Sequence, residues 1–356
     1  MTSNFEEVKA FRATLPQPRG AHSFLDRGKY LAPIAEKCGR DPSGLCLKIG
    51  YLDPLEPNES LESWTGGHKS PILDFTKLQN ICHWQGIAPR VYAVDVIDYE
   101  KYRFGVQLQD FVEGKHEGSN KQLFEKVCNI LEEYGAVGRR HGDIPWNSVA
   151  GQWVDFGSFS LPDKEPYKQK ILESLEGLGK YQKIPGIFTG HRDTEERAKD
   201  LQLDKIDFRG KTVLDIGCAQ GMFCNYASKR GAKRVIGIDK GQNVGISRQV
   251  SNYFEEFNVD YIETNLQGMS YEEFCQIVDI HVFDIVFFLS ASAYLDWPEF
   301  IHKVVGDLMV FERSSGPQAR GDEAGVKELL SHFSVEQFPR SRDKEREIYW
   351  CRKKVG

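Results

Sequence analysis

The fold of this chain is decided by the stretch Val213-Leu-Asp-Ile-Gly-Cys-Ala-Gln-Gly221. A short apolar run leads into two glycines, and residues 222–229 beyond them have the pattern of a helix. Glycine at such a turn lets the backbone approach a ligand, because no Cβ stands in the way. Further on, Val235-Ile-Gly-Ile-Asp239 predicts a second buried strand that ends on a carboxylate. This combination predicts that a nucleoside binds here: a strand, a glycine turn, a helix and a second strand that ends on an acidic residue.

The spacing of the glycines limits the kind of nucleotide that this turn can hold. They are arranged as Gly217-x-x-x-Gly221, whereas a dinucleotide site has the tighter pattern G-x-G-x-x-G. That tighter pattern holds a pyrophosphate at a helix N-terminus, so no pyrophosphate cradle is expected here. Asp239 lies at about the spacing at which a carboxylate accepts hydrogen bonds from both ribose hydroxyls of a nucleoside.

These residues resemble the Rossmann-like class of S-adenosylmethionine-dependent methyltransferases, from about Phe208 to the C-terminus. Beyond the first two strands, the expected strands are Val259–Asn265, Phe283–Leu289, Asp307–Glu312, Ser334–Phe338 and Arg346–Cys351. A helix is expected over Ala324–Phe333, and the last two strands suit the antiparallel hairpin that closes the sheet of this family. The resemblance implies an α/β domain over residues 206–356 with a seven-stranded Rossmann-like methyltransferase sheet.

The resemblance also implies S-adenosylmethionine as the cofactor and a set of residues that would bind it. These residues are Asp215, Gly217, Cys218, Ala219, Gln220, Gly221, Asp239, Asn265 and Ser290. The alternative left open is a doubly wound sheet that has the same glycine turn but no ligand.

The methyl acceptor is harder to predict. Methyl transfer is an in-line displacement that mainly requires positioning, and it requires a base only for a neutral hydroxyl or amine. Residues 290–296 read Ser-Ala-Ser-Ala-Tyr-Leu-Asp and lack the Asn/Asp-Pro-Pro-Tyr/Phe run that grips a planar amino group in this family. Adenine and glutamine amino groups are therefore not expected. Tyr294, Asp296 and Glu312 at predicted strand ends are candidate catalytic residues, although carboxylates there commonly cap helices or form turns.

A loop upstream of the glycine turn supplies two more candidates. Gly186–Thr194 leads into a predicted helix, Thr194–Leu201, with Thr194 or Asp193 as its cap. Methyltransferases often cover the cofactor with such a segment, so His191 is a candidate base and Arg192 a candidate anion clamp. The alternative is that both are solvated loop residues. Residues 161–205 are expected to form a helical linker and cofactor-covering segment, with apolar helical spacing over Lys168–Leu178.

Four further motifs follow one another in the first half of the chain. They are Lys48 inside the apolar strand Leu45–Gly50, the strand Phe104–Gln109 running into Asp110–Gly114, His141-Gly-Asp-Ile-Pro-Trp-Asn147 and Trp153-Val-Asp-Phe-Gly157. This order resembles the protein-kinase-like and aminoglycoside-phosphotransferase-like fold. The resemblance implies that Lys48 contacts ATP phosphates and that Asp143 accepts the hydroxyl proton. Asn147 and Asp155 would hold magnesium.

The chain departs from the kinase pattern in several places. The loop from Asp143 to Asn147 is one residue too short, and Phe24–Tyr30 has one glycine where a phosphate-covering loop has several. The candidate partners of Lys48, in a glycine-interrupted region predicted to be a poor helix, are Glu59, Glu62 and Asp74. Too few residues remain for a large C-terminal lobe. We therefore expect residues 20–160 to be a truncated α+β kinase-like small lobe with a reduced C-lobe, a degenerate pseudokinase. Two alternative interpretations stay open: an active kinase that uses Mg-ATP, and a chance occurrence of these motifs.

Composition limits the compartment and the partners. The chain has 356 residues and a formal net charge of −6, which does not favour a broad electrostatic grip on nucleic acid. Lys229, Arg230, Lys233 and Arg234 form either a local basic patch or a solvated helix end. Eight cysteines without a C-x-x-C pair indicate reduced thiols in a cytoplasmic protein, and no apolar run reaches membrane-spanning length.

The predicted function is that of a cytoplasmic two-domain enzyme that transfers a methyl group to a small molecule or a glycan. Three alternatives stay open: a bifunctional kinase and methyltransferase, a methyltransferase of structured RNA, and a scaffold that binds nucleotides without turnover. The sequence does not predict the oligomeric state.

Overall fold

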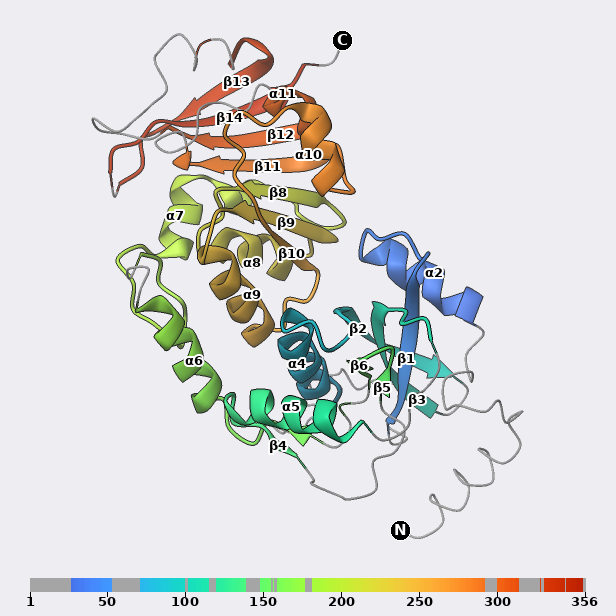
Figure 1. Cartoon of the computed structure of the whole chain (residues 1–356). Coiled ribbons are helices and arrows are strands. Elements are labelled where there is room, and N and C mark those ends of the chain that lie inside the picture. The colour runs from blue at the N-terminus through green and yellow to red at the C-terminus, as the bar shows by residue number, and fades with distance from the viewer. Residues whose placement is uncertain are drawn as a thin grey trace. The chain divides into compact units, whose positions relative to one another are not determined.

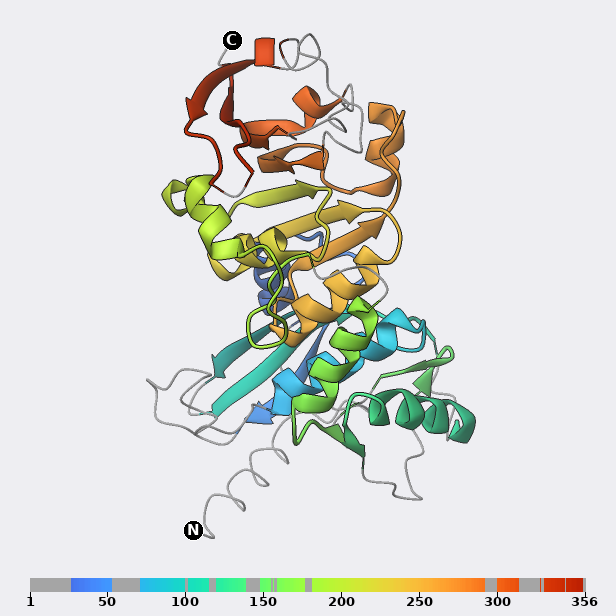
Figure 2. The ribbon, with the colours of Figure 1, turned by 90° about the vertical axis from the view of Figure 1, so that its left-hand side faces the viewer.

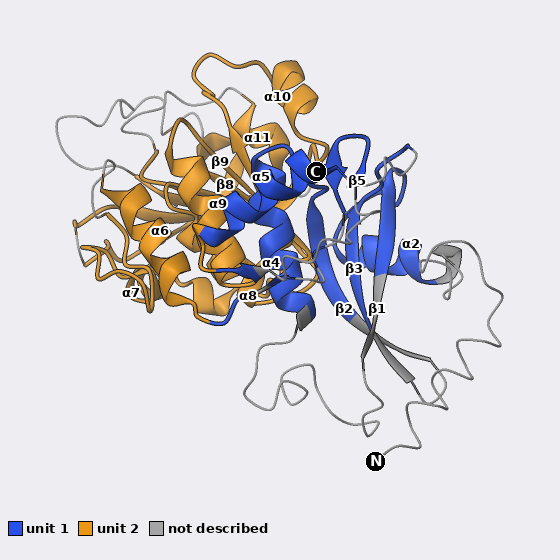
Figure 3. Ribbon diagram, turned by 60° about the horizontal axis from the view of Figure 1, so that its bottom comes forward, with its two compact units in different colours: residues 1–132, 136–162 blue, residues 133–135, 163–356 orange. Residues whose placement is uncertain are grey.

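The computed structural model describes most of the chain in two compact units (Figure 3). The described residues are 27–52, 71–99, 102–114, 120–138, 148–154, 156, 159–176, 181–291, 300–313, 327, 330–342 and 344–354. Unit 1 comprises residues 1–132 and 136–162, and unit 2 comprises residues 133–135 and 163–356.

Unit 1 is built on a three-stranded antiparallel sheet with the order β1-β3-β2 (Figure 1). Its strands are β1 (Leu45–Leu52), β2 (Val91–Tyr99) and β3 (Tyr102–Asp110), and its helices are α2 (Arg27–Lys37), α4 (Pro71–Trp84) and α5 (Lys121–Glu132). Two short antiparallel pairs follow, β4 (Val137–Gly138) with β7 (Phe159–Ser160) and β5 (Ser148–Val149) with β6 (Gln152–Trp153).

Helix α4 corrects the prediction of a poor helix around Asp74. The glycines that interrupt this region precede the helix, which begins at Pro71, and proline is well tolerated at a first helical position because it lacks an N–H. A buried polar ladder then fixes α4 to β3: Gln79 Nε2 donates to Gln109 Oε1 at 2.9 Å, and Gln107 Nε2 donates to Thr76 Oγ1 at 2.5 Å. Asp74 therefore lies in the first turn of a regular helix.

Unit 2 contains a seven-stranded sheet with the order β10-β9-β8-β11-β12-β14-β13. Its strands are β8 (Thr212–Ile216), β9 (Arg234–Asp239), β10 (Val259–Glu263), β11 (Phe283–Leu289), β12 (Val305–Glu312), β13 (Phe333–Phe338) and β14 (Ile348–Lys353). Neighbours from β10 to β12 run parallel, whereas β14 is antiparallel to both β12 and β13. The prediction of a seven-stranded Rossmann-like α/β sheet closed by an antiparallel hairpin is thus confirmed.

The helices of unit 2 can be followed in Figure 2. They are α6 (Glu165–Leu175), α7 (Thr194–Asp200), a 3-10 turn (Leu203–Lys205), α8 (Met222–Lys229), α9 (Asn243–Tyr253), α10 (Tyr271–Ile277) and α11 (Ile301–Val304). Of the helix predicted over Ala324–Phe333, most residues lie outside the described part of the chain. The last strand begins at Ile348 instead of the predicted Arg346, because Ser341 and Arg346 close a turn: Ser341 N donates to Arg346 O at 2.9 Å, and Arg346 N donates to Ser341 Oγ at 3.1 Å.

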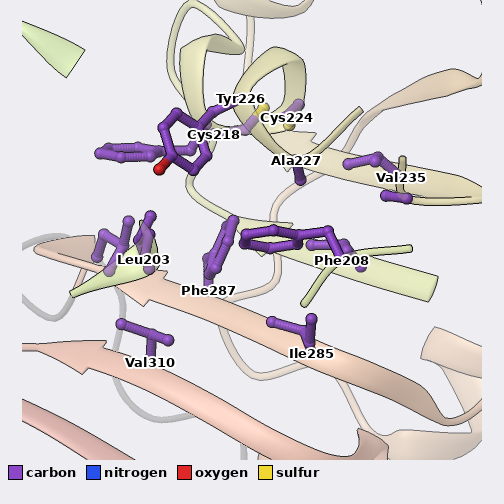
Figure 4. Close-up of a cluster of buried hydrophobic side chains, with 14 of the residues drawn as sticks. Leu203, Phe208, Cys218, Cys224, Tyr226, Ala227, Val235, Ile285, Phe287 and Val310 are labelled. Carbon is purple, nitrogen blue, oxygen red and sulfur yellow. The ribbon is translucent and has the colours of Figure 1, made fainter. Parts of the chain in front are cut away.

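The parallel strands β8, β9 and β11 are buried on both faces, as expected of a parallel sheet covered on two sides. Successive residues point to opposite faces, so Phe287 of β11 packs with α8, and its neighbour Phe288 packs with α10 and α11. On the α8 side, the ring of Phe287 lies 6.1 Å from that of Phe208 and 6.2 Å from that of Phe223 (Figure 4). Each face of the parallel part of the sheet is therefore covered by a buried apolar layer.

All eight cysteines are free, and six of them are buried. Within the described residues, no helix is long and apolar enough to cross a membrane. The same residues contain no group of three or more histidine, cysteine, aspartate or glutamate side chains that could hold a metal ion.

Candidate functional site

The glycine loop, residues 217–221, joins β8 to α8 through three left-handed backbone positions. Gly217, Ala219 and Gly221 have φ angles of +75°, +49° and +73°. The backbone N–H groups of Gly217 and Cys218 donate to Ile238 O at 2.8 and 3.1 Å. These two bonds fasten the loop to the end of β9, directly beside Asp239.

Gly221 is required by packing as well as by its φ angle. A Cβ at this position would lie 2.2 Å from the Tyr261 hydroxyl oxygen, which is closer than any real contact. The Tyr261 hydroxyl is also hydrogen-bonded to Ser251 Oγ at 2.7 Å, so it is not free to move aside. The second glycine of the motif therefore makes room for a side chain of β10.

Asp239 is the acidic residue that the sequence placed at the end of a strand, and it binds the glycine loop. Its Oδ2 accepts a hydrogen bond from Ala219 N at 2.6 Å, and its Oδ1 accepts one from Lys240 N at 2.7 Å. The side chain is half-buried, and Asn243 Nδ2 also donates to Oδ1, at the long distance of 3.5 Å. Oδ2 therefore keeps room for a second hydrogen bond, while a ribose hydroxyl would compete with Asn243 for Oδ1, and the residues fit the nucleoside part of S-adenosylmethionine.

Asp215 lies beneath the loop and has a different environment. It is 2 % exposed, and burial raises the pKa of its carboxyl to about 7. The Cys224 thiol donates to Asp215 Oδ2 at 3.3 Å. In the described structure, this carboxyl thus faces a buried thiol, with Asp239 and Arg197 as the nearby charges that act on its pKa.

The remaining predicted cofactor residues lie at several places. Cys218 is buried within the glycine loop, and Gln220 Oε1 accepts a hydrogen bond from Gln182 N at 3.1 Å. Asn265 is exposed beyond β10, and its side chain accepts from Gln267 N at 3.1 Å. Ser290 is treated below with Glu312. The link from Gln182 to Gln220 was not predicted, and it fastens the upstream loop to the glycine loop.

The upstream loop separates the two candidates His191 and Arg192. His191 is exposed, whereas Arg192 is buried and donates to the Tyr181 hydroxyl from within the loop. Asp193, and not Thr194, caps α7, because its side chain accepts from the N–H groups of the first helical turn. Arg192 is therefore engaged inside the loop, and His191 is the more accessible of the pair.

A buried ionic cluster lies at the carboxyl ends of β11 and β12. Glu312 is 1 % exposed, and its Oε2 accepts from Arg197 Nη2 at 2.7 Å and from Arg346 Nη1 at 3.2 Å. Ser290 Oγ also donates to this oxygen, and Ser290 N donates to Glu312 O at 2.8 Å. We call Arg197, Ser290, Glu312 and Arg346 the Glu312 cluster. The sequence pointed to Ser290 and Glu312, but it offered no signal for the two arginines.

The basic residues that follow α8 do not form one patch. Arg234 is buried at the start of β9, where it pairs with Asp260 at 2.8 Å and with Asp279 at 2.7 Å. Lys229 lies over the Phe254 ring and Arg230 over the Tyr226 ring. Arg234 is thus a structural residue and not part of a solvated helix end.

The candidate residues of unit 1 are described only in part. Asp143, Asn147, Asp155, Glu59 and Glu62 lie outside the described residues, as do Tyr294 and Asp296 of unit 2. Lys48 is described: its Nζ donates to Val154 O at 2.9 Å. The β1 lysine therefore contacts the backbone of the residue that precedes Asp155.

Comparison with known proteins identifies relatives for part of unit 2. The family described as FtsJ-like methyltransferase matches residues 198–303. The ribosomal protein L11 methyltransferase of Tolumonas auensis is 35 % identical over 99 residues, which are 23 % of this chain and 34 % of that protein. The tRNA U34 carboxymethyltransferase of Cellvibrio japonicus is 28 % identical over 185 residues, which are 45 % of this chain and 55 % of that protein. The chain thus spans from about a third to about half the length of these relatives.

Two solved structures also resemble the chain. The N-terminal domain of EvdMO1, crystallised with SAH and D-fucose, covers 54 % of this chain and 97 % of its own length, with 15 % identity and a TM-score of 0.42. The bifunctional kinase-methyltransferase WbdD covers 52 % of this chain and 45 % of its own length, with 19 % identity and a TM-score of 0.37. By sequence over residues 198–303, and by the strand order of its sheet, the second unit is therefore similar to S-adenosylmethionine-dependent methyltransferases.

Proposed function

We propose that this protein is an S-adenosylmethionine-dependent methyltransferase whose acceptor is a small molecule or a glycan. The observation that carries the proposal is the bond of 2.6 Å from Ala219 N to Asp239 Oδ2. It sets a carboxylate with spare acceptor capacity next to a left-handed backbone loop at the carboxyl edge of a parallel sheet, where ligands of such folds bind. When bound, the cofactor would supply a methyl group on a sulfonium.

The residues of the chain would then orient this cofactor. Asp239 would accept hydrogen bonds from the ribose hydroxyls, and the glycine loop, which has no Cβ at Gly217, would allow the ligand to approach its backbone closely. Gln182 and Gln220, which are bonded to each other, would hold the covering segment in place. His191 and Glu312 are the two candidate bases, since the imidazole of His191 is exposed within that segment and the carboxylate of Glu312 lies at the carboxyl end of β12.

The proposed acceptor class rests on the net charge of the chain and on the absence of a sequence motif that binds planar amino groups. The formal net charge is −6, and Arg234 is withdrawn from the basic residues 229–234 into a buried ion pair with Asp260. Residues 290–296 lack the run that grips a planar amino group. A small molecule or a glycan therefore fits better than a nucleic acid or a protein amide. The proposed compartment is the cytoplasm, since the eight cysteines are free.

Structured RNA is the second candidate acceptor, because one relative is named as a tRNA U34 carboxymethyltransferase. The two candidates differ in salt dependence, since binding through phosphate contacts weakens steeply as salt rises. Isothermal calorimetry with S-adenosylhomocysteine tests the cofactor site itself. We expect measurable binding by the wild-type protein, and its absence would overturn the proposed function.

We further propose that unit 1 is a degenerate kinase-like module. The contact of Lys48 Nζ with Val154 O supports this, because it brings the strand lysine to the segment that leads into Asp155-Phe-Gly157. The hairpin of β5 and β6 between Asn147 and Asp155 agrees with such a module. The segment from Asp143 to Asn147 is one residue shorter than the kinase pattern, and this argues against phosphoryl transfer.

A further inference from the structure

The Glu312 cluster adjoins the proposed cofactor site on two sides. A Cβ on Gly217 would lie 3.0 Å from Ala291 Cβ, so the glycine loop touches the residue that follows Ser290. The guanidinium of Arg197 lies 4.9 Å from the centre of the Phe223 ring, and Phe223 belongs to the first turn of α8. The cluster therefore lies beside the loop that would hold the cofactor.

The cluster contains buried polar atoms that the described part of the chain does not satisfy. Three such atoms lack a hydrogen-bond partner: Oε1 of Glu312, Nε of Arg197 and Nε of Arg346. Both arginine contacts and the Ser290 hydroxyl bond go to the other oxygen of Glu312, Oε2. Because a buried polar atom without a partner is costly, native proteins rarely leave one unless a ligand or water completes it.

We propose that Glu312 Oε1 accepts a hydrogen bond from a neutral hydroxyl of the methyl acceptor. This inference rests on the proposed function and specifies its acceptor class. The free atom of Glu312 needs a donor, which excludes a carboxylate acceptor because a carboxylate has no proton to donate. A charged amine would supply a proton, but it would be repelled by the guanidinium groups of Arg197 and Arg346. A neutral hydroxyl meets both conditions.

In the proposed reaction, the O–H bond of the acceptor breaks, and its proton passes to Glu312. A bond forms between the acceptor oxygen and the methyl carbon, while the carbon–sulfur bond breaks and leaves its electron pair on sulfur. The products are a methyl ether and S-adenosylhomocysteine. The unpartnered N–H groups of the two arginines are donors of the kind that stabilises an oxygen as it loses its proton.

The test compares the wild-type protein with Glu312→Gln in an assay of S-adenosylhomocysteine release. Glutamine keeps the size of the side chain and an acceptor oxygen, but it does not take up a proton. The hydroxyl probes are methyl β-D-glucopyranoside, methyl α-L-rhamnopyranoside and catechol, and the contrasting probes are benzoate and cadaverine. The matched control is Glu336→Gln, which alters an exposed glutamate of β13.

We expect turnover with at least one hydroxyl probe and none with benzoate or cadaverine. Glu312→Gln should lower that turnover about 100-fold or more, the usual effect of removing a group that takes up a proton. Its affinity for S-adenosylhomocysteine should stay within about threefold of wild type, which shows that the variant is folded. Glu336→Gln should match the wild type in both measurements.

The remaining outcomes would overturn the acceptor class, the role of Glu312 or the proposed function. Turnover confined to benzoate or cadaverine, or binding of S-adenosylhomocysteine without turnover of any hydroxyl probe, would overturn the acceptor class. Unchanged turnover by Glu312→Gln would overturn the role of Glu312 and leave the cluster a structural ion pair. If Glu312→Gln loses S-adenosylhomocysteine binding while the wild type and the control keep it, Glu312→Asp is measured next, because aspartate keeps the charge. Restored binding with turnover still low upholds the proposal. Full turnover by Glu312→Asp overturns it. Absence of binding in the wild-type protein would instead overturn the proposed function.

Discussion

Asp239 Oδ2 accepts a hydrogen bond of 2.6 Å from the backbone N–H of Ala219, and this bond links the end of β9 to the loop after β8. The same carboxylate is therefore both a structural partner of the loop and the proposed ligand of the ribose. The two roles can be separated, because only the second depends on the cofactor.

The first prediction concerns this carboxylate. Asp239→Ala should weaken binding of S-adenosylhomocysteine by about 1–3 kcal/mol, because the ribose hydroxyls lose their acceptor. Calorimetry measures the change directly. Asp307→Ala, at an exposed aspartate of β12, serves as the control and should bind like the wild type. Equal affinities of Asp239→Ala and the control would contradict the assigned role.

The second prediction concerns pH and Asp215. Burial raises the pKa of this carboxyl to about 7, so between its ordinary value of 3.8 and pH 7 the unfolded chain releases the proton that the folded chain retains. The folded state therefore loses stability as the pH rises through this window, and the loss levels off above about pH 7. Asp215→Asn has no proton to lose, so it should stabilise the protein more at pH 8 than at pH 5.

Urea denaturation at these two pH values measures the difference, which should be on the order of a few kcal/mol. Asp307→Asn is the control at an exposed site, and its effect should be the same at both pH values. A stabilisation by Asp215→Asn that does not change with pH would show that the carboxyl titrates normally.

The third prediction concerns the glycine loop. Gly221→Ala should be more destabilising than Gly241→Ala, although both glycines have similar φ angles of +73° and +69°. A Cβ at Gly241 meets nothing within 4 Å, so its substitution introduces only backbone strain of about 1 kcal/mol. A Cβ at Gly221 also overlaps the Tyr261 hydroxyl, which should add about 1–3 kcal/mol. Equal denaturation midpoints for the two variants would refute the packing role of Gly221.

The fourth prediction concerns unit 1. Magnesium-ATP should bind weakly or not at all, and Asp143→Ala should leave methyl transfer almost unchanged, because its base matters only where a phosphoryl group moves. Thermal-shift measurements with magnesium-ATP and with S-adenosylhomocysteine compare the wild type with Asp143→Ala and Asp155→Ala. Strong stabilisation by ATP that Asp155→Ala abolishes would make the chain a bifunctional kinase and methyltransferase.

Local sequence determined the parallel sheet, since each strand carries its own apolar run and each turn its own glycine or polar residues. Phe283–Leu289 was predicted with both of its ends, and Asp239 was placed at the end of a strand because a polar residue closes an apolar run there. A tight turn at Gly217 and Gly221 also followed from residue type, whereas its left-handed backbone angles are a finding of the structure. The end of the last hairpin was less well predicted, since a turn made by Ser341 and Arg346 decides where β14 begins.

Only the tertiary structure decided which distant side chains meet at the site. Arg197 and Glu312 are 115 residues apart, and Ser290 and Arg346 are 56 apart, yet they share one buried carboxylate oxygen. Nothing local marks an arginine on a short polar helix as buried, because its burial depends on the strand order that brings the ends of β11 and β12 next to it. The sequence by itself thus determined the sheet, the glycine loop and Asp239. Packing of segments far apart in the chain determined the partners of Glu312, because those contacts exist only once the strands are in register.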